Sequence, residues 1–160
     1  MVVVIITGTP ATGKSTLARL LDGKFGYSLI DTNKLVKKLS EGFDKKRHCV
    51  IVDSKRLNKE LISTIKRHKG QNLVIDSHLS HYLSPKYVDL CIVTKCSLKQ
   101  LKKRLEERYK DKDKVRENLD AEIFDICHNE AKDLGHKVVV VDTTKGINIA
   151  KVKKLITLGK

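Results

Sequence analysis

Short apolar runs alternate along the chain with longer segments in which apolar residues recur at helical spacing. Five of the apolar runs are predicted to be strands, at residues 2–7, 27–30, 72–76, 89–94 and 137–142. They are apolar at nearly every position, as expected of strands that are buried on both faces. Strands that alternate with helices favour an α/β fold, in which helices cover both faces of a parallel sheet.

The segment 33–70 predicts two helices. Leu57 and Ile65 fall on one face of the second helix. A polar turn at 42–44 is expected to separate the two helices, and residues 45–60 are interpreted as an inserted helical segment.

The second half of the chain predicts three further helices. Residues 97–100 form a capping-box start, and Leu98 is expected to point inward with the leucines that follow it at helical spacing. Residues 109–114 are polar or aromatic with no period, and predict a short mobile excursion. Near-helical spacing then predicts one helix over 119–134, and a last helix is expected at 149–158.

A phosphate-binding loop is the strongest chemical signal, because residues 8–15 read GTPATGKS and complete the pattern G-x-x-x-x-G-K-[ST]. The loop lies between the first strand and a helix that starts at Lys14. Its glycines let backbone N–H groups turn inward around phosphate, and the helix N-terminus adds free N–H groups. Lys14 would reach the β and γ phosphates, and the Ser15 hydroxyl would ligate Mg²⁺. A glycine turn without ligand is the alternative; the complete pattern favours nucleoside triphosphate binding.

Two candidate catalytic residues follow the strand at 72–76. Asp76 ends this strand, and ligands in sheets of this kind bind at the carboxyl ends of strands, so its carboxylate is expected to hold the Mg²⁺ hydration shell. His78 would orient a water or touch the transferred phosphoryl group. The alternatives are a helix-capping or turn role for Asp76 and an ordinary loop position for His78. Asp53, which also ends an apolar run, is a rival acid for the metal shell.

Arg104 and Arg108 are four residues apart, so both guanidinium groups leave the same face of their predicted helix. Arginine can stabilise charge on a transferred phosphoryl group, whereas the alternative is two solvated arginines on a basic helix. The sequence disfavours a switch GTPase. Residues 76–79 lack the glycine of Asp-x-x-Gly, and residues 94–97 lack both the Asn and the Asp of Asn-Lys-x-Asp.

Composition adds a question about partners. The 160 residues fit one domain and carry a net charge of +14, which a small-molecule enzyme does not need. The excess indicates a polyanionic partner, with nucleic acid first, or simply a Lys-rich surface. The four cysteines suit neither a zinc site nor a disulfide framework. No apolar stretch approaches the roughly 20 residues of a membrane span, and no targeting segment precedes the first strand, so a cytoplasmic location is expected.

Four motifs together resemble the adenylate kinase 6 family, also called the CINAP proteins. The motifs are Gly8-Thr9-Pro10-x-Thr12-Gly13-Lys14-Ser15-Thr16, Asp76-x-His78, Ser84-Pro85 and Glu122-Ile123. The resemblance covers essentially the whole chain, which looks like an archaeal member. It implies a nucleoside-monophosphate-kinase fold and broad adenylate kinase activity with ATPase activity. It also implies a role in maturation of the small ribosomal subunit, with a small-subunit ribosomal protein and rRNA as partners.

The resemblance also implies roles for residues by position. The residues that it implies for ATP are Ala11, Gly13, Lys14, Ser15, Thr16, Arg108 and Lys145. Asp76 and His78 match the catalytic pair of the family, and Arg108 matches its lid arginine. An AMP-binding helical insert is implied at about 31–54, and a short lid at about 107–117.

Three positions depart from the pattern of this family. Ala11 stands where the family often has Gly, so the loop is expected to be stiffer. Lys37 stands where the AMP insert often has Arg, and Lys binds phosphate without the bidentate fork. The lid reads Arg108-Tyr109-Lys110 instead of Arg-Gly-Tyr.

The combined expectation is Mg²⁺-dependent transfer of the γ-phosphoryl group of ATP to AMP. One alternative is an assembly ATPase whose nucleotide turnover switches contact with a ribosomal protein and rRNA. Another is a kinase for a different small acceptor.

Overall fold

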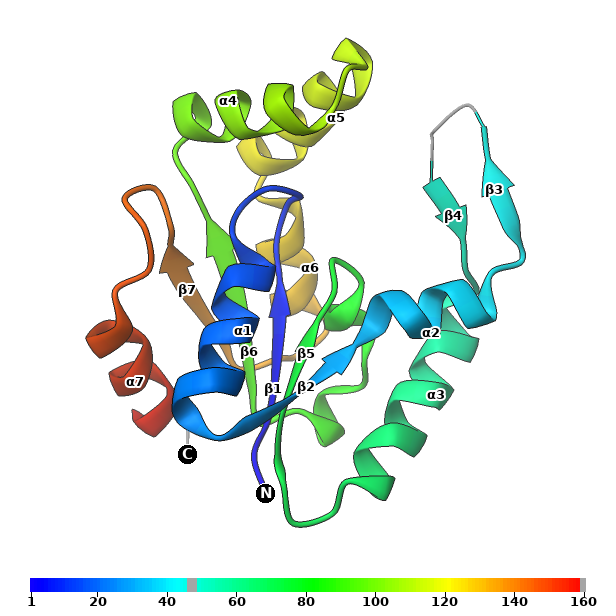
Figure 1. Cartoon of the computed structure of the whole chain (residues 1–160), viewed down its shortest axis with the longest axis vertical. Coiled ribbons are helices and arrows are strands. Elements are labelled where there is room, and N and C mark those ends of the chain that lie inside the picture. The colour runs from blue at the N-terminus through cyan, green and yellow to red at the C-terminus, as the bar shows by residue number, and fades with distance from the viewer. Residues whose placement is uncertain (46–48, 159–160) are drawn as a thin grey trace.

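A five-stranded parallel sheet organises the chain in the computed structural model, which describes residues 1–45 and 49–158 (Figure 1). The strands are β1 Val3–Thr7, β2 Tyr27–Asp31, β5 Asn72–Asp76, β6 Leu90–Lys95 and β7 Val138–Asp142. They lie in the order β2-β5-β1-β6-β7, and every neighbouring pair is parallel. This confirms the predicted α/β fold, and each strand boundary agrees with its prediction to about one residue.

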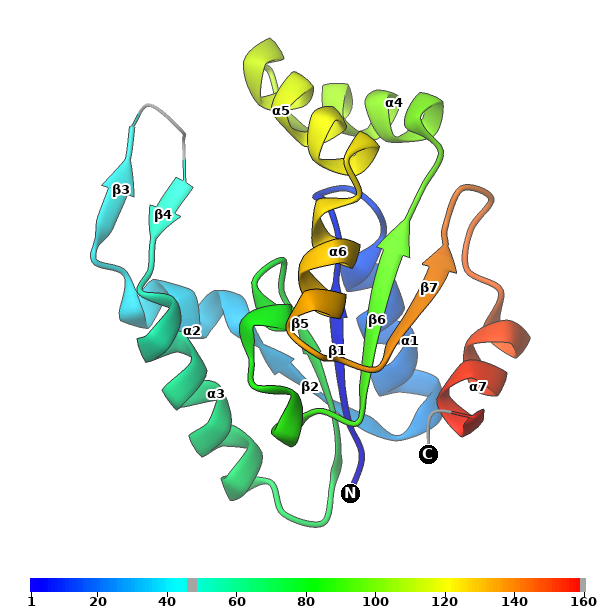
Figure 2. The same ribbon diagram turned by 180° about the vertical axis from the view of Figure 1, so that it is seen from behind.

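Helices cover both faces of the sheet (Figures 1 and 2). The helices that pack on it are α1 Lys14–Phe25, α3 Ser54–Arg67, α6 Ile126–Asp133 and α7 Ile149–Leu158. Along β1, Val4 and Ile6 pack into a core shared with α1 and α7, whereas Val3 and Ile5 pack into a second core shared with α3 and α6. Successive side chains of a strand point to opposite faces, so one apolar run supplies both cores. In the part of the chain that the structure describes, no helix has the length and apolar character of a membrane span.

The insert between β2 and β5 differs from the two helices and turn that the sequence predicts. It contains α2 Thr32–Leu39, β3 Gly42–Asp44, β4 Cys49–Ile51 and then α3. Strands β3 and β4 pair antiparallel and project away from the sheet (Figure 1). The predicted turn at 42–44 is therefore a strand, and the predicted helical segment at 45–60 includes a strand before α3 begins. Strands of three residues are too short to show an alternating pattern. Residues 46–48, which belong to the predicted AMP-binding insert, lie outside the described residues.

Between β6 and β7 the structure has α4 Leu98–Arg108, then α5 Lys112–Ile123, then α6. The predicted excursion at 109–114 is half helical, because the Asp111 side chain accepts hydrogen bonds from the first free N–H groups of α5. The single helix predicted over 119–134 is also wrong. It is broken at Asp125, whose φ of 54° is left-handed. Leu98 is 45% exposed and does not point inward, since it occupies the first turn of α4.

Candidate active site

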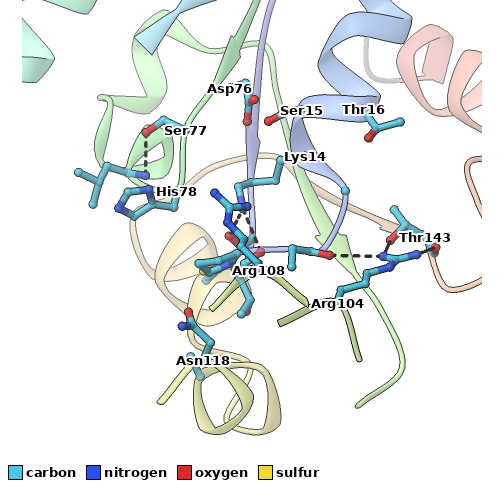
Figure 3. Close-up of a pocket in the computed structure, with 18 of the residues that line it drawn as sticks. Lys14, Ser15, Thr16, Asp76, Ser77, His78, Arg104, Arg108, Asn118 and Thr143 are labelled. Carbon is cyan, nitrogen blue, oxygen red and sulfur yellow. Dashed lines mark hydrogen bonds between the residues drawn. The ribbon is translucent and has the colours of Figure 1, made fainter. Parts of the chain in front are cut away.

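A cavity of about 1300 Å³ opens at the carboxyl ends of β1 and β5 (Figure 3). Its lining includes the loop between β1 and α1, the loop after β5, and residues of α2, α4 and α5. The predicted site residues that line it are Ala11, Gly13, Lys14, Ser15, Thr16, Asp76, His78, Arg104 and Arg108. Lys37 and Lys145 are exposed and lie outside this lining, although their neighbours Val36 and Gly146 belong to it.

Backbone conformation explains the glycines of the phosphate-binding loop. Gly8 has a φ of +140°, and a Cβ on it would lie 2.6 Å from the carbonyl oxygen of Thr94. Gly13, the N-cap residue just before α1, has a φ of +92°. Both conformations favour glycine, so the two fixed glycines of the pattern are required by the fold of the loop. Ala11 has a φ of 68°, a left-handed conformation that strains a residue with a Cβ.

Buried side chains hold the loop in place. The Thr9 hydroxyl donates to a carboxylate oxygen of Glu122 at 2.6 Å, and Glu122 itself is buried on α5. The Thr12 hydroxyl contacts that of Thr94 at 2.7 Å, and the Thr143 hydroxyl donates to the carbonyl of Thr12 at 2.7 Å. The loop is therefore tied to β6, to the segment after β7 and to α5, so its N–H groups are arranged before any phosphate binds.

Lys14 lies inside this loop. Its ammonium group donates to the carbonyl oxygens of Gly8 at 2.8 Å and Thr9 at 2.9 Å. Burial lowers the pKa of Lys14 to about 8, and the negative charge of Asp76 opposes part of that change. A triphosphate in the cavity would add negative charge beside the ammonium, and would favour the charged form.

A pH dependence follows from this pKa. We expect kcat/KM for ATP to fall as the pH rises above about 8, because the free enzyme then loses the positive charge of Lys14. The profile is measured from initial rates between pH 6 and about 10. The Lys14→Arg variant stays charged throughout this range, so its lower kcat/KM should lack the alkaline fall. An alkaline fall of equal size in both proteins would contradict the assignment.

Asp76 and Ser15 form the metal-binding side of the cavity. Asp76 ends β5 beside Ile6 of β1, and Figure 3 shows its carboxylate and the Ser15 hydroxyl directed toward the same space. The backbone carbonyl of Asp76 accepts a hydrogen bond from the Thr32 hydroxyl, and Asp76 lines the cavity. The two oxygen donors fit Mg²⁺, which takes few protein ligands and completes its shell with water and phosphate. Among the described residues, no group of three or more His, Cys, Asp or Glu side chains could hold a metal.

Asp53, the rival acid, has a different position. Its side chain caps α3 by accepting a hydrogen bond from the N–H of Lys55 at 2.8 Å, and it does not line the cavity. The structure therefore places one of the two candidate acids at the loop and assigns the other to a helix end.

His78 lies beside Lys14 and Arg108 in the cavity (Figure 3). Burial lowers its pKa below 6.5, and the positive charges of Lys14 and Arg108 lower it further. The imidazole is therefore neutral at neutral pH, and one of its nitrogens can accept a hydrogen bond. The loop that carries it is fixed, because the Ser80 hydroxyl bonds the carbonyls of Ser77 and Ile6.

The two arginines of α4 have different surroundings. The Arg104 guanidinium donates to the carbonyl of Thr143 at 3.0 Å and to that of Ala11 at 3.4 Å. Arg104 therefore braces the phosphate-binding loop. Arg108 lines the cavity one turn later, and among the residues that the structure describes it makes no hydrogen bond. Its charge is left available to a ligand.

Comparisons with known proteins place the sequence in a family. The AAA domain family matches residues 4–125. A "Putative adenylate kinase" of Methanocaldococcus jannaschii is 40% identical over 144 residues, which cover 88% of this chain and 76% of that protein. One of Pyrococcus furiosus is 37% identical over 142 residues, with 89% and 75% covered. The chain belongs to the family of these archaeal proteins.

A solved structure shows that the fold also occurs in more distant sequences. The crystal structure of a "putative kinase" from Chloroflexus aurantiacus has a TM-score of 0.59 and 17% identity, with 99% of this chain and 97% of that chain covered. At this identity the likeness shows the fold alone. The phosphate-binding loop of this family member therefore lies on an α/β P-loop fold.

Beyond the lid implied at about 107–117, sequence reasoning missed the contribution of α5 to the site of this family member. One face of α5 lines the cavity with Lys114, Glu117, Asn118 and Ala121. Their spacing of three and four residues is the signal that could have found them, had residues 109–114 been read as leading into a helix. On the opposite wall Tyr82 and Glu130 also line the cavity, and they come from segments with no motif.

Proposed function

We propose that this protein is an adenylate kinase, which transfers the γ-phosphoryl group of ATP to AMP and forms two ADP. The observation that carries the proposal is the convergence of a complete phosphate-binding loop, Lys14, Asp76 and Arg108 on one cavity. The names of the archaeal relatives support it. The motifs Asp76-x-His78 and Glu122-Ile123 support placing it in the adenylate kinase 6 branch, with weaker ATPase activity beside the transfer.

The chain's own residues would bind and orient the nucleotides. Backbone N–H groups of the loop and of the start of α1, those of Ala11, Gly13 and Thr16 among them, would surround the β and γ phosphates, and Lys14 would neutralise them. Ser15 directly and Asp76 through water would hold Mg²⁺, which would supply positive charge to the same phosphate oxygens. Arg108 would stabilise charge on the group in transfer. Exclusion of water by α4 and α5 would favour AMP over hydrolysis.

The test is to separate the nucleotides formed from ATP and Mg²⁺ with and without AMP. The proposal expects AMP to be consumed, with about two ADP formed for each AMP. Formation of ADP and phosphate at a rate that AMP does not change would overturn it. Omitting Mg²⁺ and adding EDTA tests the metal in the same assay, and should stop turnover.

His78 gives a narrower prediction. His78→Ala should lower kcat by about a hundredfold while it changes ATP affinity less than about threefold, because the neutral imidazole acts on the reacting groups and not on the bound phosphates. Steady-state rates and the binding of a fluorescent ATP analogue separate the two effects. His128→Ala is the matched control, since His128 lies on α6 outside the cavity lining. Equal kcat in both variants would make His78 a bystander.

A second candidate function, an assembly ATPase that contacts ribosomal protein and rRNA, is favoured by one observation. Residues 31–70 carry 12 Lys and Arg against 5 Asp and Glu, which is half of the net charge in a quarter of the chain. Lys55, Lys59 and Lys66 are exposed along α3. Such a surface fits the phosphates of RNA.

Salt dependence tests this second function. Affinity for an rRNA fragment should fall steeply with salt, and replacing Lys55, Lys59 and Lys66 with Gln should reduce both affinity and slope. Replacing exposed lysines of α4, Lys102 and Lys103, is the matched control. An RNA affinity that none of these changes alters would rule out this surface as the RNA contact.

A further inference from the structure

Tyr109, between α4 and α5, brings two cations of the cavity together. The guanidinium carbon of Arg108 lies 5.5 Å from the centre of the Tyr109 ring, and the ammonium of Lys114 lies 4.8 Å from it. Both distances are within the range of attraction between a cation and the negative face of an aromatic ring. Tyr109, Arg108 and Lys114 all line the cavity.

The Tyr109 ring is fixed by packing. It contacts a small core that includes Leu101, Leu105 and Val115, from both α4 and α5. Its backbone N–H donates to the carbonyl of Leu105 at 2.8 Å, which ends α4 at this residue. Packing therefore fixes the position of the ring at the junction of the two helices. Contact with the ring in turn restricts the positions of the two cations.

An aromatic ring suits this task better than a carboxylate. Arg108 and Lys114 carry like charges, which repel each other when they are held close together. A carboxylate between them would neutralise the charge and compete with phosphate. A π face attracts both cations without placing a further negative charge between them.

The charge of Arg108 already reaches the catalytic residues from this position, since it contributes to the lowered pKa of Lys14 and to that of His78. A change in the position of its guanidinium group would therefore be felt at the phosphate-binding loop as well as at the lid.

We propose that Tyr109 is a positioning residue, whose ring holds Arg108 and Lys114 so that α4 and α5 present their two cations to the triphosphate as a pair. The proposal rests on the phosphoryl transfer proposed above. It assigns Tyr109 a role through its neighbours and not through its own hydroxyl.

The test compares Tyr109→Phe with Tyr109→Leu. Phe keeps the π face, so kcat should stay within about twofold of the wild type; Leu keeps an apolar contact with the small core but loses the π face, and kcat should fall about tenfold. Tyr87→Leu is the matched control, because Lys86 lies 5.1 Å from that ring and Tyr87 is outside the cavity lining. It should alter thermal stability without altering kcat.

A double-mutant cycle shows whether Tyr109 acts through Lys114. Lys114→Met should lower kcat in the wild type but much less in the Tyr109→Leu background. Equal impairment of the Phe and Leu variants would overturn the proposal, as would a normal kcat in the Leu variant. If the wild type forms no ADP from AMP, the kinase function fails, and affinity for MgATP then decides the role of Tyr109. If Tyr109→Leu binds MgATP more weakly and Tyr109→Phe does not, the positioning role is supported. Equal affinity in the wild type and both variants overturns it.

Discussion

Replacing Lys14 with methionine should abolish nucleotide turnover, with a loss in kcat/KM of about a thousandfold or more, and should leave the protein at least as stable as the wild type. The first effect follows because the ammonium of Lys14 lies inside the phosphate-binding loop, where it would neutralise the β and γ phosphates. The second follows from the burial that lowers the pKa of Lys14 to about 8. A folded-state pKa below the unfolded value means that the charged form disfavours folding at neutral pH. Turnover and thermal unfolding, measured on the same preparation, check both effects.

A change at the other end of the same helix controls for the loss of positive charge. Lys24 is exposed in the last turn of α1, and Lys24→Met should leave turnover within about twofold of the wild type. If Lys14→Met retains turnover, the loop is not the triphosphate site. If Lys14→Met loses turnover only because the protein unfolds, the prediction that the buried charge of Lys14 disfavours folding is wrong.

Lys14 is expected to be needed for turnover although its buried charge disfavours folding. This conflict shows why the loop was the easiest part of the site to predict. A phosphate-binding loop needs glycines where φ is positive and a lysine where burial disfavours it. Requirements of this kind are local, so they are visible in eight consecutive residues. The strands were predictable for a related reason, since burial on both faces leaves apolar residues such as Val3 and Val4 side by side.

Helix α5 shows why other parts could not be predicted. Val115 is buried in the small core, but the face with Lys114 and Asn118 lines the open cavity and needs no apolar residues. The apolar period of a helix weakens when two of its faces meet water. The break at Asp125 was hidden too, because Ile123 and Ile126 are exposed yet continue an apolar pattern.

Arg104 and Arg108 pose the sharpest case, because their spacing places both on one face of α4 and no sequence pattern separates them. The difference comes from the segment after β7, which brings Thr143 within hydrogen-bond distance of Arg104 alone. The two residues should therefore fail in different ways when they are replaced.

We expect Arg108→Ala to lower kcat by about a thousandfold with little change in stability, because its charge is directed at the cavity and stabilises the group in transfer. Arg104→Ala should instead lower the free energy of unfolding by about 2 kcal/mol, since it removes charged hydrogen bonds to the backbone of Ala11 and Thr143. Its kcat should fall less than that of Arg108→Ala, and its KM for ATP should rise as the loop loosens. Denaturant unfolding and steady-state kinetics of the two variants measure the free energy of unfolding, kcat and KM.

Two further variants test whether Arg104 holds the loop and Arg108 acts on the transferred group. Lys103→Ala, on the exposed side of the same helix, should change none of the quantities and so controls for net charge. Arg108→Lys should recover part of the lost kcat, because a lysine restores the charge but not the planar fork that binds two phosphate oxygens. If Arg104→Ala proves the more damaging to kcat and Arg108→Ala the more damaging to stability, the roles are reversed. Arg108 would then hold the loop in place from within the cavity. Arg104, one turn nearer the start of α4, would act on the nucleotide.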